Sequence, residues 1–447
     1  MKLAILGGGG FRVPLVYDAL LRDHEPGRIT DLVLHDIDRA RVGATARVLA
    51  AQARDVPDAP RVTVTADLDD AVTGADFVFS AIRVGGTGGR VVDERVALAE
   101  GVLGQETVGA GGVAYGLRTV PVARDIARRV ATRAPDAWVI NFTNPAGLVT
   151  EAMAEYLGHK VIGICDSPVG LCRRIARTLR LDPERIRFDY AGLNHLGWVR
   201  AAYVDGRDVL PDLLAANDLI ASFEEGRMFG AEWLRALGAV PNEYLHYYYF
   251  TREAIGAATG AAQTRGEFLL HQQESFYASL GDGGAPALES WHRVLAQRER
   301  TYMADNRAAA GLGERDACDL ESGGYQDVAL ALMRAIAHDE RTTLILNVRN
   351  QGVLAPLADD AVVELPCRVD GLGPRPLSAD PLDEHQAGLV LAVKAVEHAV
   401  IEAARSGSRA AALRAFALHP LVDSVAVATR MLDTYQQQLT GLAYLGS

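Results

Sequence analysis

Cys165 and His195 supply a thiolate and an imidazole, two side chains that bind divalent transition metals. Cys165 ends an apolar run that predicts a strand of a parallel sheet, at the carboxyl edge where open α/β folds place ligand sites. Two protein ligands leave positions for water or substrate oxygens, as metal-assisted reactions require. From spacing alone an alternative stays open, in which Cys165 is a small buried hydrophobe and His195 an ordinary core or surface residue.

Asp166 directly follows Cys165, and two uses compete for its carboxyl group. As a general acid it would protonate a leaving oxygen. As a helix cap it would accept hydrogen bonds from free backbone N–H groups, because a helix is expected to begin near Pro168. The sequence leaves both uses open.

Tyrosines are dense in the run Tyr244-Leu245-His246-Tyr247-Tyr248-Tyr249-Phe250. An aromatic stripe of this kind usually packs a core or an interface. A phenol has an ordinary pKa of about 10, so a tyrosine that acts as a base at neutral pH needs a metal or an arginine nearby. A tyrosine of this run can therefore act as a base only if a nearby positive charge lowers its pKa.

A glycine-rich turn, Gly7-Gly8-Gly9-Gly10-Phe11, follows the first apolar run and precedes a helical stretch from Leu15 to Arg22. Between a strand and a helix, such a turn lets backbone N–H groups approach a pyrophosphate. Asp36 ends the second strand and would bind an adenosine ribose, which favours NAD over NADP. The fingerprint is imperfect, because its third glycine is replaced by Arg12, and an ordinary tight turn is the alternative.

In the first 165 residues, short β-rich runs alternate with helical stretches, and these elements would position the residues described above. Several are apolar on both faces, as expected where helices cover both sides of a parallel sheet. This pattern predicts a doubly wound, Rossmann-like α/β fold. The expected strands are Lys2 to Leu6, Asp31 to His35, Arg61 to Thr65, Asp76 to Ala81, Ala137 to Asn141 and Lys160 to Cys165; helices are expected at Val42 to Ala53 and Val120 to Ala131.

A second part of the chain, residues 166–447, is predicted to be an α-rich α+β domain. Ile186 to His195 and Trp198 to Val204 predict closely joined strands, and Asp205-Gly206 is a turn signal. Amphipathic stretches near 284–310, 324–338 and 384–436 predict helices. We therefore expect a nucleotide-binding domain over residues 1–165 and a boundary near residue 165.

Composition excludes several classes of protein. With 447 residues, a formal net charge of -12 and charges of both signs scattered along it, the chain is not expected to bind nucleic acid, which normally requires a basic face. No run of about 18 apolar residues predicts a membrane span. The four cysteines, Cys165, Cys172, Cys318 and Cys367, are too few for a disulfide framework, so we expect a cytoplasmic protein.

Six segments, taken in order, resemble glycoside hydrolase family 4, whose members use NAD and a divalent metal. The sequence Asn141-Phe142-Thr143-Asn144-Pro145 and the tyrosine run are most similar to those of the 6-phospho-β-glucosidases of that family. The segments are Gly7 to Pro14, Gly104-Gln105-Glu106-Thr107 with Gly109 to Gly112, Asn141-Phe142-Thr143-Asn144-Pro145, Gly163 to Pro168, Gly192-Leu193-Asn194-His195 and Asn347 to Gly352.

The resemblance implies roles for individual residues. Cys165 and His195 would hold the metal, typically manganese, and Tyr244 would remove the proton from sugar carbon 2, with Tyr247 and Tyr248 as rivals. Asp166 departs from the β-specific members, which often have asparagine there, and matches the aspartate that acts as general acid in phospho-α-glucosidases. Arg90, Asn144 and, more weakly, Arg265 would hold substrate, with the Arg90 guanidinium forked onto a 6-phosphate.

The reaction that the resemblance implies is hydrolysis of 6-phospho-β-glucosides. NAD oxidises carbon 3, the carbon-2 proton is removed, the aglycone is eliminated, water adds and the ketone is reduced again, so NAD ends unchanged. A 6-phospho-α-glucosidase or another glycosidase of the family is the near alternative. An NAD-dependent 2-hydroxy-acid dehydrogenase and a non-enzymatic nucleotide sensor are the distant ones. The resemblance also implies a homodimer or homotetramer.

Overall fold

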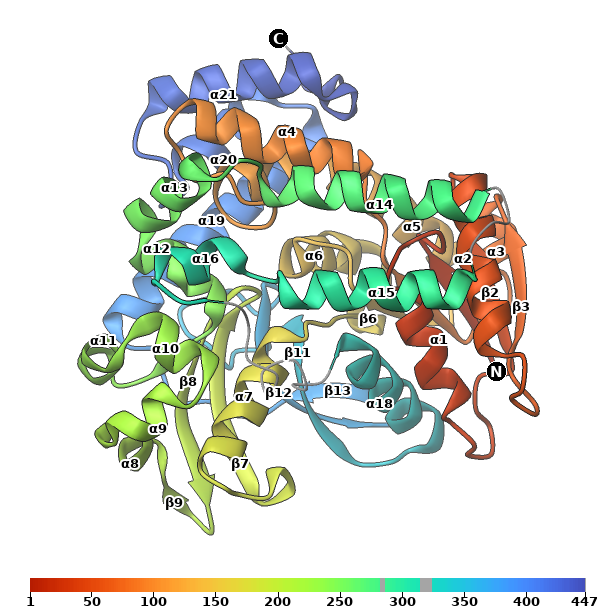
Figure 1. Cartoon of the computed structure of the whole chain (residues 1–447), viewed down its shortest axis with the longest axis horizontal. Helices are drawn as coiled ribbons and strands as arrows, with labels where there is room; N and C mark the ends of the chain where they lie inside the picture. Colours follow the sequence, from red (N-terminus) through yellow and green to blue (C-terminus); the bar gives the residue numbers. More distant parts are fainter. Residues whose placement is uncertain (282–285, 314–323, 447) are drawn as a thin grey trace.

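One mixed sheet of 13 strands runs through the computed structural model, which describes residues 1–281, 286–313 and 324–446 (Figure 1). Its order is β10-β8-β7-β12-β11-β6-β5-β4-β1-β2-β3, with β9 beside β8 and β13 beside β12. Neighbours are parallel from β3 to β6 and antiparallel from β11 to β10. The boundary that we place near residue 165 follows β6, where the direction changes.

The parallel half is the doubly wound α/β fold that the sequence predicts. All six expected strands form, the last three slightly shorter than expected. Residues of β1 alternate between the faces: Leu3 and Ile5 pack with α1, α2 and α18, whereas Ala4 and Leu6 pack with α3, α5 and α6. The elements are β1 Lys2–Leu6, α1 Val13–Leu21, β2 Asp31–His35, α2 Arg39–Gln52, β3 Arg61–Thr65, α3 Leu68–Val72, β4 Phe77–Ser80, α4 Gly86–Ala99, α5 Gly109–Arg133, β5 Trp138–Asn141, α6 Ala146–Leu157, η1 Gly158–Lys160, β6 Val161–Gly163 and α7 Ser167–Thr178.

Helix α5 begins at Gly109, earlier than the start at Val120 that its apolar periodicity predicts, and this extra part of the helix is rich in glycine. A Cβ on Gly111 would lie 2.0 Å from the main-chain oxygen of Gln105, and one on Gly112 would lie 2.5 Å from that of Thr107. The helix therefore packs directly on the backbone of residues 105–107. This contact fixes the loop that carries Glu106 and Thr107.

The antiparallel half contains the expected hairpin, in which β7 and β8 are joined by Asn194 and His195. The predicted Asp205-Gly206 turn joins β8 to the short strand β9, and its φ angles of 49° and 82° are those of a tight hairpin turn. The sequence did not predict β11 and β12, which join this hairpin to β6. The elements are η2 Pro183–Arg185, β7 Ile186–Leu193, β8 Leu196–Val204, β9 Arg207–Asp208, β10 Val240–Pro241, β11 Thr342–Arg349, β12 Val362–Asp370 and β13 Gly373–Pro376.

Helices make up most of the remaining C-terminal part, as predicted. The amphipathic stretch 384–436 forms three helices, and the first of them, α19, ends at Gly407, which has a φ of 71°. Figure 1 shows α14 and α15 running from the centre of the molecule to α2. The helices are α8 Leu210–Ala215, α9 Asn217–Ala221, α10 Glu224–Phe229, α11 Ala231–Leu237, η3 Glu243–Leu245, α12 His246–Tyr249, α13 Thr251–Gly260, α14 Arg265–Gly281, α15 Ala287–Arg300, α16 Ala304–Ala309, α18 Tyr325–His338, α19 Glu384–Ser406, α20 Arg409–Ala417, α21 Val425–Gln438 and η4 Thr440–Leu442.

Two expectations about the whole chain can be compared with this fold. Within the described ranges, no helix has both the length and the apolar character that crossing a bilayer requires. Cys165, Cys172 and Cys367 are buried free thiols, as expected. Cys318 lies outside the described residues.

Candidate functional site

The glycine-rich turn is tightly folded between β1 and α1. Gly7 has a φ of 83°, and a Cβ there would lie 2.5 Å from the main-chain oxygen of Ala81. The N–H groups of Gly7 and Gly8 donate to the main-chain oxygen of His35, and Gly10 N–H donates to Gly7 O. Only glycine fits this close approach of two strand ends, so the turn is built to bring its backbone to a groove.

A groove of about 1040 Å³ extends along this turn. Gly7, Gly9, Gly10 and Phe11 line it, whereas Gly8 packs against Leu34 instead. The Phe11 ring itself turns into an aromatic cluster, so this residue meets the groove with little more than its backbone. The turn therefore offers main-chain atoms, rather than side chains, to a ligand.

Asp36 also lines the groove, where the sequence placed it. Its carboxylate already accepts hydrogen bonds from the N–H groups of Gly9, at 2.8 Å, and Asp38, at 2.9 Å. Each carboxylate oxygen has a second lone pair, so ribose hydroxyls can be added to these bonds. Asp36 thus braces the glycine turn in addition to its predicted contact with a ribose.

Three aromatic side chains from the C-terminal part hold the carbonyl groups of the turn. Tyr277 on α14 donates to Gly9 O at 2.7 Å, Trp291 on α15 to Phe11 O at 2.9 Å, and Tyr325 on α18 to Arg12 O at 2.7 Å. With its carbonyls directed at these donors, the turn is held in one conformation. Nothing in the local sequence of the turn predicted this clamp.

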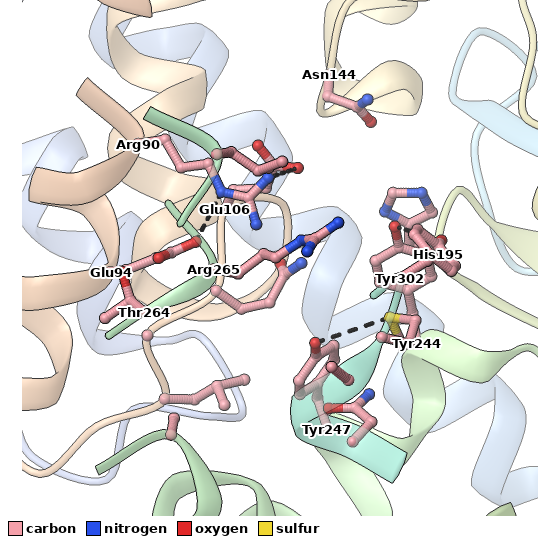
Figure 2. Close-up of a pocket in the computed structure, with 18 of the residues that line it drawn as sticks. Arg90, Glu94, Glu106, Asn144, His195, Tyr244, Tyr247, Thr264, Arg265 and Tyr302 are labelled. Atoms are coloured by element: carbon pink, nitrogen blue, oxygen red, sulfur yellow. Dashed lines mark hydrogen bonds and ion pairs between the residues drawn. The ribbon is translucent and has the colours of Figure 1, made fainter. Parts of the chain in front are cut away.

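A second, deeper pocket meets the groove. Arg12, Arg83, Phe142, Asn144 and Arg298 line both, so a ligand in the groove can reach the pocket. The pocket brings together every residue that the sequence assigned to metal, substrate or catalysis, namely Arg90, Asn144, Cys165, Asp166, His195, Tyr244 and Arg265. Figure 2 shows Arg90, Glu94 and Glu106 on one side of it and His195, Tyr244 and Tyr302 on the other.

Cys165 and His195 are both buried at the pocket wall, each 5% exposed. Burial lowers the pKa of His195 to about 3, so the imidazole is neutral, as a metal ligand must be. Burial, with Glu364 and Asp166, raises the pKa of Cys165 well above its usual value. A cation bound there would offset this effect and stabilise the thiolate. The two side chains thus fit a divalent metal.

The described residues contain no cluster of three or more His, Cys, Asp or Glu side chains arranged to hold a metal. A cation on Cys165 and His195 would therefore complete its coordination with water or substrate oxygens. Such an arrangement is typical of a site that acts on a substrate, because structural metal sites are closed by protein ligands.

Thr107 fixes which nitrogen of His195 faces the pocket. Gln105 Oε1 accepts hydrogen bonds from the N–H groups of Thr107 and Val108, which identifies it as the oxygen, and also from Thr107 Oγ1 at 3.0 Å. The single hydroxyl hydrogen of Thr107 is used in that bond, so Thr107 Oγ1 accepts from His195 Nδ1 at 3.0 Å. His195 therefore carries its proton on Nδ1 and its lone pair on Nε2.

Tyr244 is the tyrosine of the aromatic run that contacts His195. Their rings are stacked, and the Tyr244 hydroxyl lies 3.2 Å from that of Tyr302. Tyr247 also lines the pocket, with its hydroxyl directed at Met303 Sδ. Tyr248 lines a different, smaller cavity, together with His419. The geometry thus favours Tyr244 over its two rivals.

Asp166 is the N-cap residue of α7, but its side chain makes no capping hydrogen bond. The carboxylate instead lies 3.7 Å from Arg12 Nη1 and lines the pocket. Of the two uses that the sequence left open, capping is therefore not seen. The position is compatible with a proton donor to a ligand in the pocket.

Arg90 is already paired, which the sequence did not predict. Its Nε donates to Glu94 Oε1 and its Nη1 to Glu106 Oε1, both at 2.7 Å. Arg83 binds the other oxygen of Glu106 at 2.6 Å. Although burial opposes it, these two arginines hold the pKa of Glu106 at about 2. A phosphate that binds to Arg90, as expected from the family position, would thus compete with the carboxylates of Glu94 and Glu106 for the guanidinium.

Arg265 is held at the centre of the pocket, as Figure 2 shows. Its Nη1 donates to Thr301 Oγ1 at 2.7 Å and its Nη2 to Arg298 O at 3.2 Å. Asn144 lies where groove and pocket meet, at the turn before α6. Both residues therefore reach the space in which the sequence placed a substrate.

Several residues of the pocket escaped sequence reasoning. All are polar: Arg12, which was noted only as the replacement of a motif glycine, and Arg83, Glu94, Arg298 and Tyr302, which belong to no motif. A signal exists for Glu94, since Arg90, Asp93 and Glu94 recur at helical spacing on α4 and are all buried. Charged residues on one face of a helix are typical of a face exposed to solvent, so the burial of these three residues was not predicted.

The fold and the pocket together define an α/β protein with a dinucleotide-type groove that opens onto a polar, cation-rich pocket. The chain belongs to family 4 of the glycosyl hydrolases: residues 2–181 match the model for "Family 4 glycosyl hydrolase" and residues 190–422 that for the "Family 4 glycosyl hydrolase C-terminal domain". It is a glycoside hydrolase, and the family resemblance of the six segments is confirmed.

Individual relatives agree with this assignment. A probable 6-phospho-beta-glucosidase of Bacillus subtilis is 32% identical, over 97% of this chain and 95% of its own. The 6-phospho-beta glucosidase from Thermotoga maritima, solved with NAD and glucose-6-phosphate, has a TM-score of 0.83 at 27% identity and 98% coverage of both chains. A 6-phospho-alpha-glucosidase from gut microorganisms, solved with NAD and Mn²⁺, has a TM-score of 0.81 at 26% identity, over 99% of this chain and 98% of its own.

Proposed function

We propose that this protein hydrolyses 6-phospho-β-glucosides with the help of NAD and a divalent metal, most suitably Mn²⁺. The observation that carries the proposal is the charge of the deep pocket. Its described lining has five arginines and three carboxylates, an excess of two positive charges in a chain of net charge -12. A sugar phosphate, with a charge of about -1.5 to -2, matches this excess.

The groove along Gly7 to Phe11 would hold NAD, and Cys165 with His195 would hold the metal. When bound there, NAD supplies a hydride acceptor and the metal a Lewis acid. The chain itself orients the sugar through Asn144, at the junction of groove and pocket, and through Arg265, inside the pocket. The B. subtilis and T. maritima relatives, which bear 6-phospho-beta-glucosidase names, support this substrate class.

Proton transfer would be divided between Tyr244 and Asp166. Once carbon 3 of the sugar is oxidised, the hydrogen on carbon 2 becomes acidic, and Tyr244 accepts it. Asp166 donates a proton to the glycosidic oxygen as the aglycone leaves. Burial, with Tyr302 and Glu243, raises the pKa of Tyr244 well above its usual value, so the phenol is protonated until positive charge is bound nearby.

Asp166 also supports a second candidate, a 6-phospho-α-glucosidase. Its carboxylate does not cap α7 and faces the pocket instead, as a general acid requires. Among the solved relatives, the enzyme from gut microorganisms bears that specificity in its name. The two candidates share the pocket and differ in the anomeric bond that Asp166 would protonate.

A panel of nitrophenyl glucosides tests the proposal. Four substrates, α- and β-linked and each with and without 6-phosphate, are assayed with NAD, Mn²⁺ and a thiol reductant. We expect turnover of the β-linked 6-phosphate, with a deuterium isotope effect or exchange at carbon 2. Turnover of the α-linked 6-phosphate alone would favour the second candidate, and cleavage with neither exchange nor an isotope effect would exclude the elimination mechanism.

Location and assembly complete the proposal. The low cysteine content favours a cytoplasmic location, and the family resemblance implies a homodimer or homotetramer. Light scattering of the purified protein, with and without NAD, measures the mass directly. A monomer at micromolar concentration would contradict the expected assembly.

A further inference from the structure

Arg298, near the end of α15, lines both the deep pocket and the groove. Its Nη1 is shielded from solvent and has no hydrogen-bond partner among the described residues. The guanidinium lies over the Phe11 ring, 5.6 Å from its centroid. A buried donor without an acceptor is costly, so this Nη1 is open to an acceptor on a ligand in the pocket.

The surroundings of Arg298 increase this cost. Burial and the charges of four other arginines lower its pKa well below the usual value. Those four arginines each have a partner: Arg12 with Asp166, Arg83 with Glu106, Arg90 with Glu94 and Glu106, and Arg265 with Thr301. Arg298 thus lies among other cations, and the carboxylate near it, Glu106, is already bonded to Arg83 and Arg90. A bound anion would therefore stabilise Arg298.

Two features hold Arg298 ready for such an anion. Arg265 Nη2 donates to its main-chain oxygen at 3.2 Å, which ties α15 to the start of α14. The Phe11 ring supports the guanidinium on one side. The Arg298 guanidinium is therefore positioned before a ligand binds, so binding costs less conformational entropy than it would for a freely moving arginine.

We propose that Arg298 is the residue that directly binds the phosphoryl group of the sugar phosphate, with Arg90 serving instead to hold Glu94 and Glu106 in place. This inference rests on the proposed function and names the residue that selects a phosphorylated sugar. The choice of sugar phosphate over cofactor pyrophosphate follows from the neighbours of Arg298: all four line the deep pocket, whereas only Arg12 and Arg83 also line the groove.

Calorimetry on the full chain, loaded with NAD and Mn²⁺, tests the role. Glucose 6-phosphate and glucose are titrated into the wild type and into Arg298→Gln, Arg298→Lys and Arg293→Gln, the last being a control at an exposed arginine on the same helix. We expect Arg298→Gln to weaken glucose 6-phosphate by about 10- to 100-fold, since charge-assisted bonds contribute about 1.5 to 3 kcal/mol. Arg298→Lys should recover part of that loss, while glucose binding and the control stay unchanged.

Two further measurements separate this role from others. NAD titration should give the same affinity in wild type and Arg298→Gln; a loss of NAD affinity instead would overturn the proposal in favour of the pyrophosphate. Arg298→Gln should also raise the melting temperature of the ligand-free protein, because it removes a cation that is repelled by four other arginines, whereas loss of a purely structural residue would lower it. If glucose 6-phosphate binds the variant as tightly as the wild type, the inference is wrong while the proposed function stands; if the wild type binds none, both fail.

Discussion

The phenol ring of Tyr244 lies flat on the imidazole of His195, with ring centroids 3.6 Å apart and an interplanar angle of 4°. The two residues come from different elements, η3 and the turn between β7 and β8. The stack therefore joins the proposed base to a proposed metal ligand through van der Waals contact. A change that preserves the ring should leave the ligand in place.

Tyr244→Phe separates the two roles. We expect kcat to fall by about 10²- to 10⁴-fold, the usual contribution of a general base, because the ring remains but the hydroxyl is lost. Mn²⁺ affinity, measured by calorimetry, should change little. Tyr248→Phe is the matched control, since that side chain lines another cavity. A Tyr244→Phe enzyme with kcat near that of wild type would assign the base elsewhere.

Thr107→Val should weaken metal binding. Without the hydroxyl, the Nδ1 proton of His195 loses its acceptor, so the tautomer that directs Nε2 to the pocket is no longer favoured. Such outer partners typically contribute about 10- to 100-fold to metal affinity. Thr107→Ser retains the hydroxyl and should bind Mn²⁺ like wild type. Equal affinities of the Val and Ser variants would show that the hydroxyl does not set the tautomer.

The ion pair between Arg118 and Asp93 should be essential for stability. Arg118 donates to both oxygens of Asp93 at 2.6 Å, neither side chain is more than 1% exposed, and the pair fastens α4 to α5. Arg118→Met leaves a buried carboxylate and should cost about 3 to 5 kcal/mol of unfolding free energy. Denaturant titration measures it. The double change with Asp93→Leu should recover much of the loss, and no recovery would argue against an unpaired charge as the cause.

Glu364 should make stability fall as pH rises. Burial raises its pKa to about 7, against an ordinary value of 4.5, even though Tyr190, Asn347 and Asn194 donate to it. Between those values the folded chain keeps a proton that the unfolded chain releases, so unfolding becomes easier as pH rises through the window. Glu364→Gln removes this dependence.

Thermal melts of the metal-free protein at pH 5 and pH 8 test the prediction. Relative to wild type, Glu364→Gln should gain roughly 3 kcal/mol between the two values, because one pKa unit corresponds to about 1.4 kcal/mol. Parallel melting curves for the two proteins at both pH values would contradict a protonated Glu364.

The parallel strands could be predicted because their residues are apolar on both faces. Strands β11 and β12 were missed because they carry Asn347 and Glu364, which are fully buried and hydrogen-bonded to each other at 2.9 Å. A polar residue inside a strand breaks the pattern on which such predictions depend. The family resemblance named the metal, substrate and catalytic candidates, and all of them line one pocket.

Charge partners are what the sequence could not provide. Whether an arginine is paired depends on side chains that are distant along the chain, as Arg95 and Glu267 illustrate on the surface. Arg90 matches a family position yet proves to be paired, whereas Arg298 matches no motif and has an open donor. Local sequence carries the type of a residue but not the residues that it will face.

The junction of β6 with β11 rests on a single residue pair, Gly163 opposite Asn347. A ribosome must therefore add almost two hundred residues after β6 before that edge is covered. Until then the nascent chain exposes unpaired N–H and C=O groups beside an apolar strand, which favours association with other chains. We expect fragments that end before residue 342 to aggregate. The two regions that match the family models, residues 2–181 and 190–422, should therefore be difficult to produce as separate polypeptides.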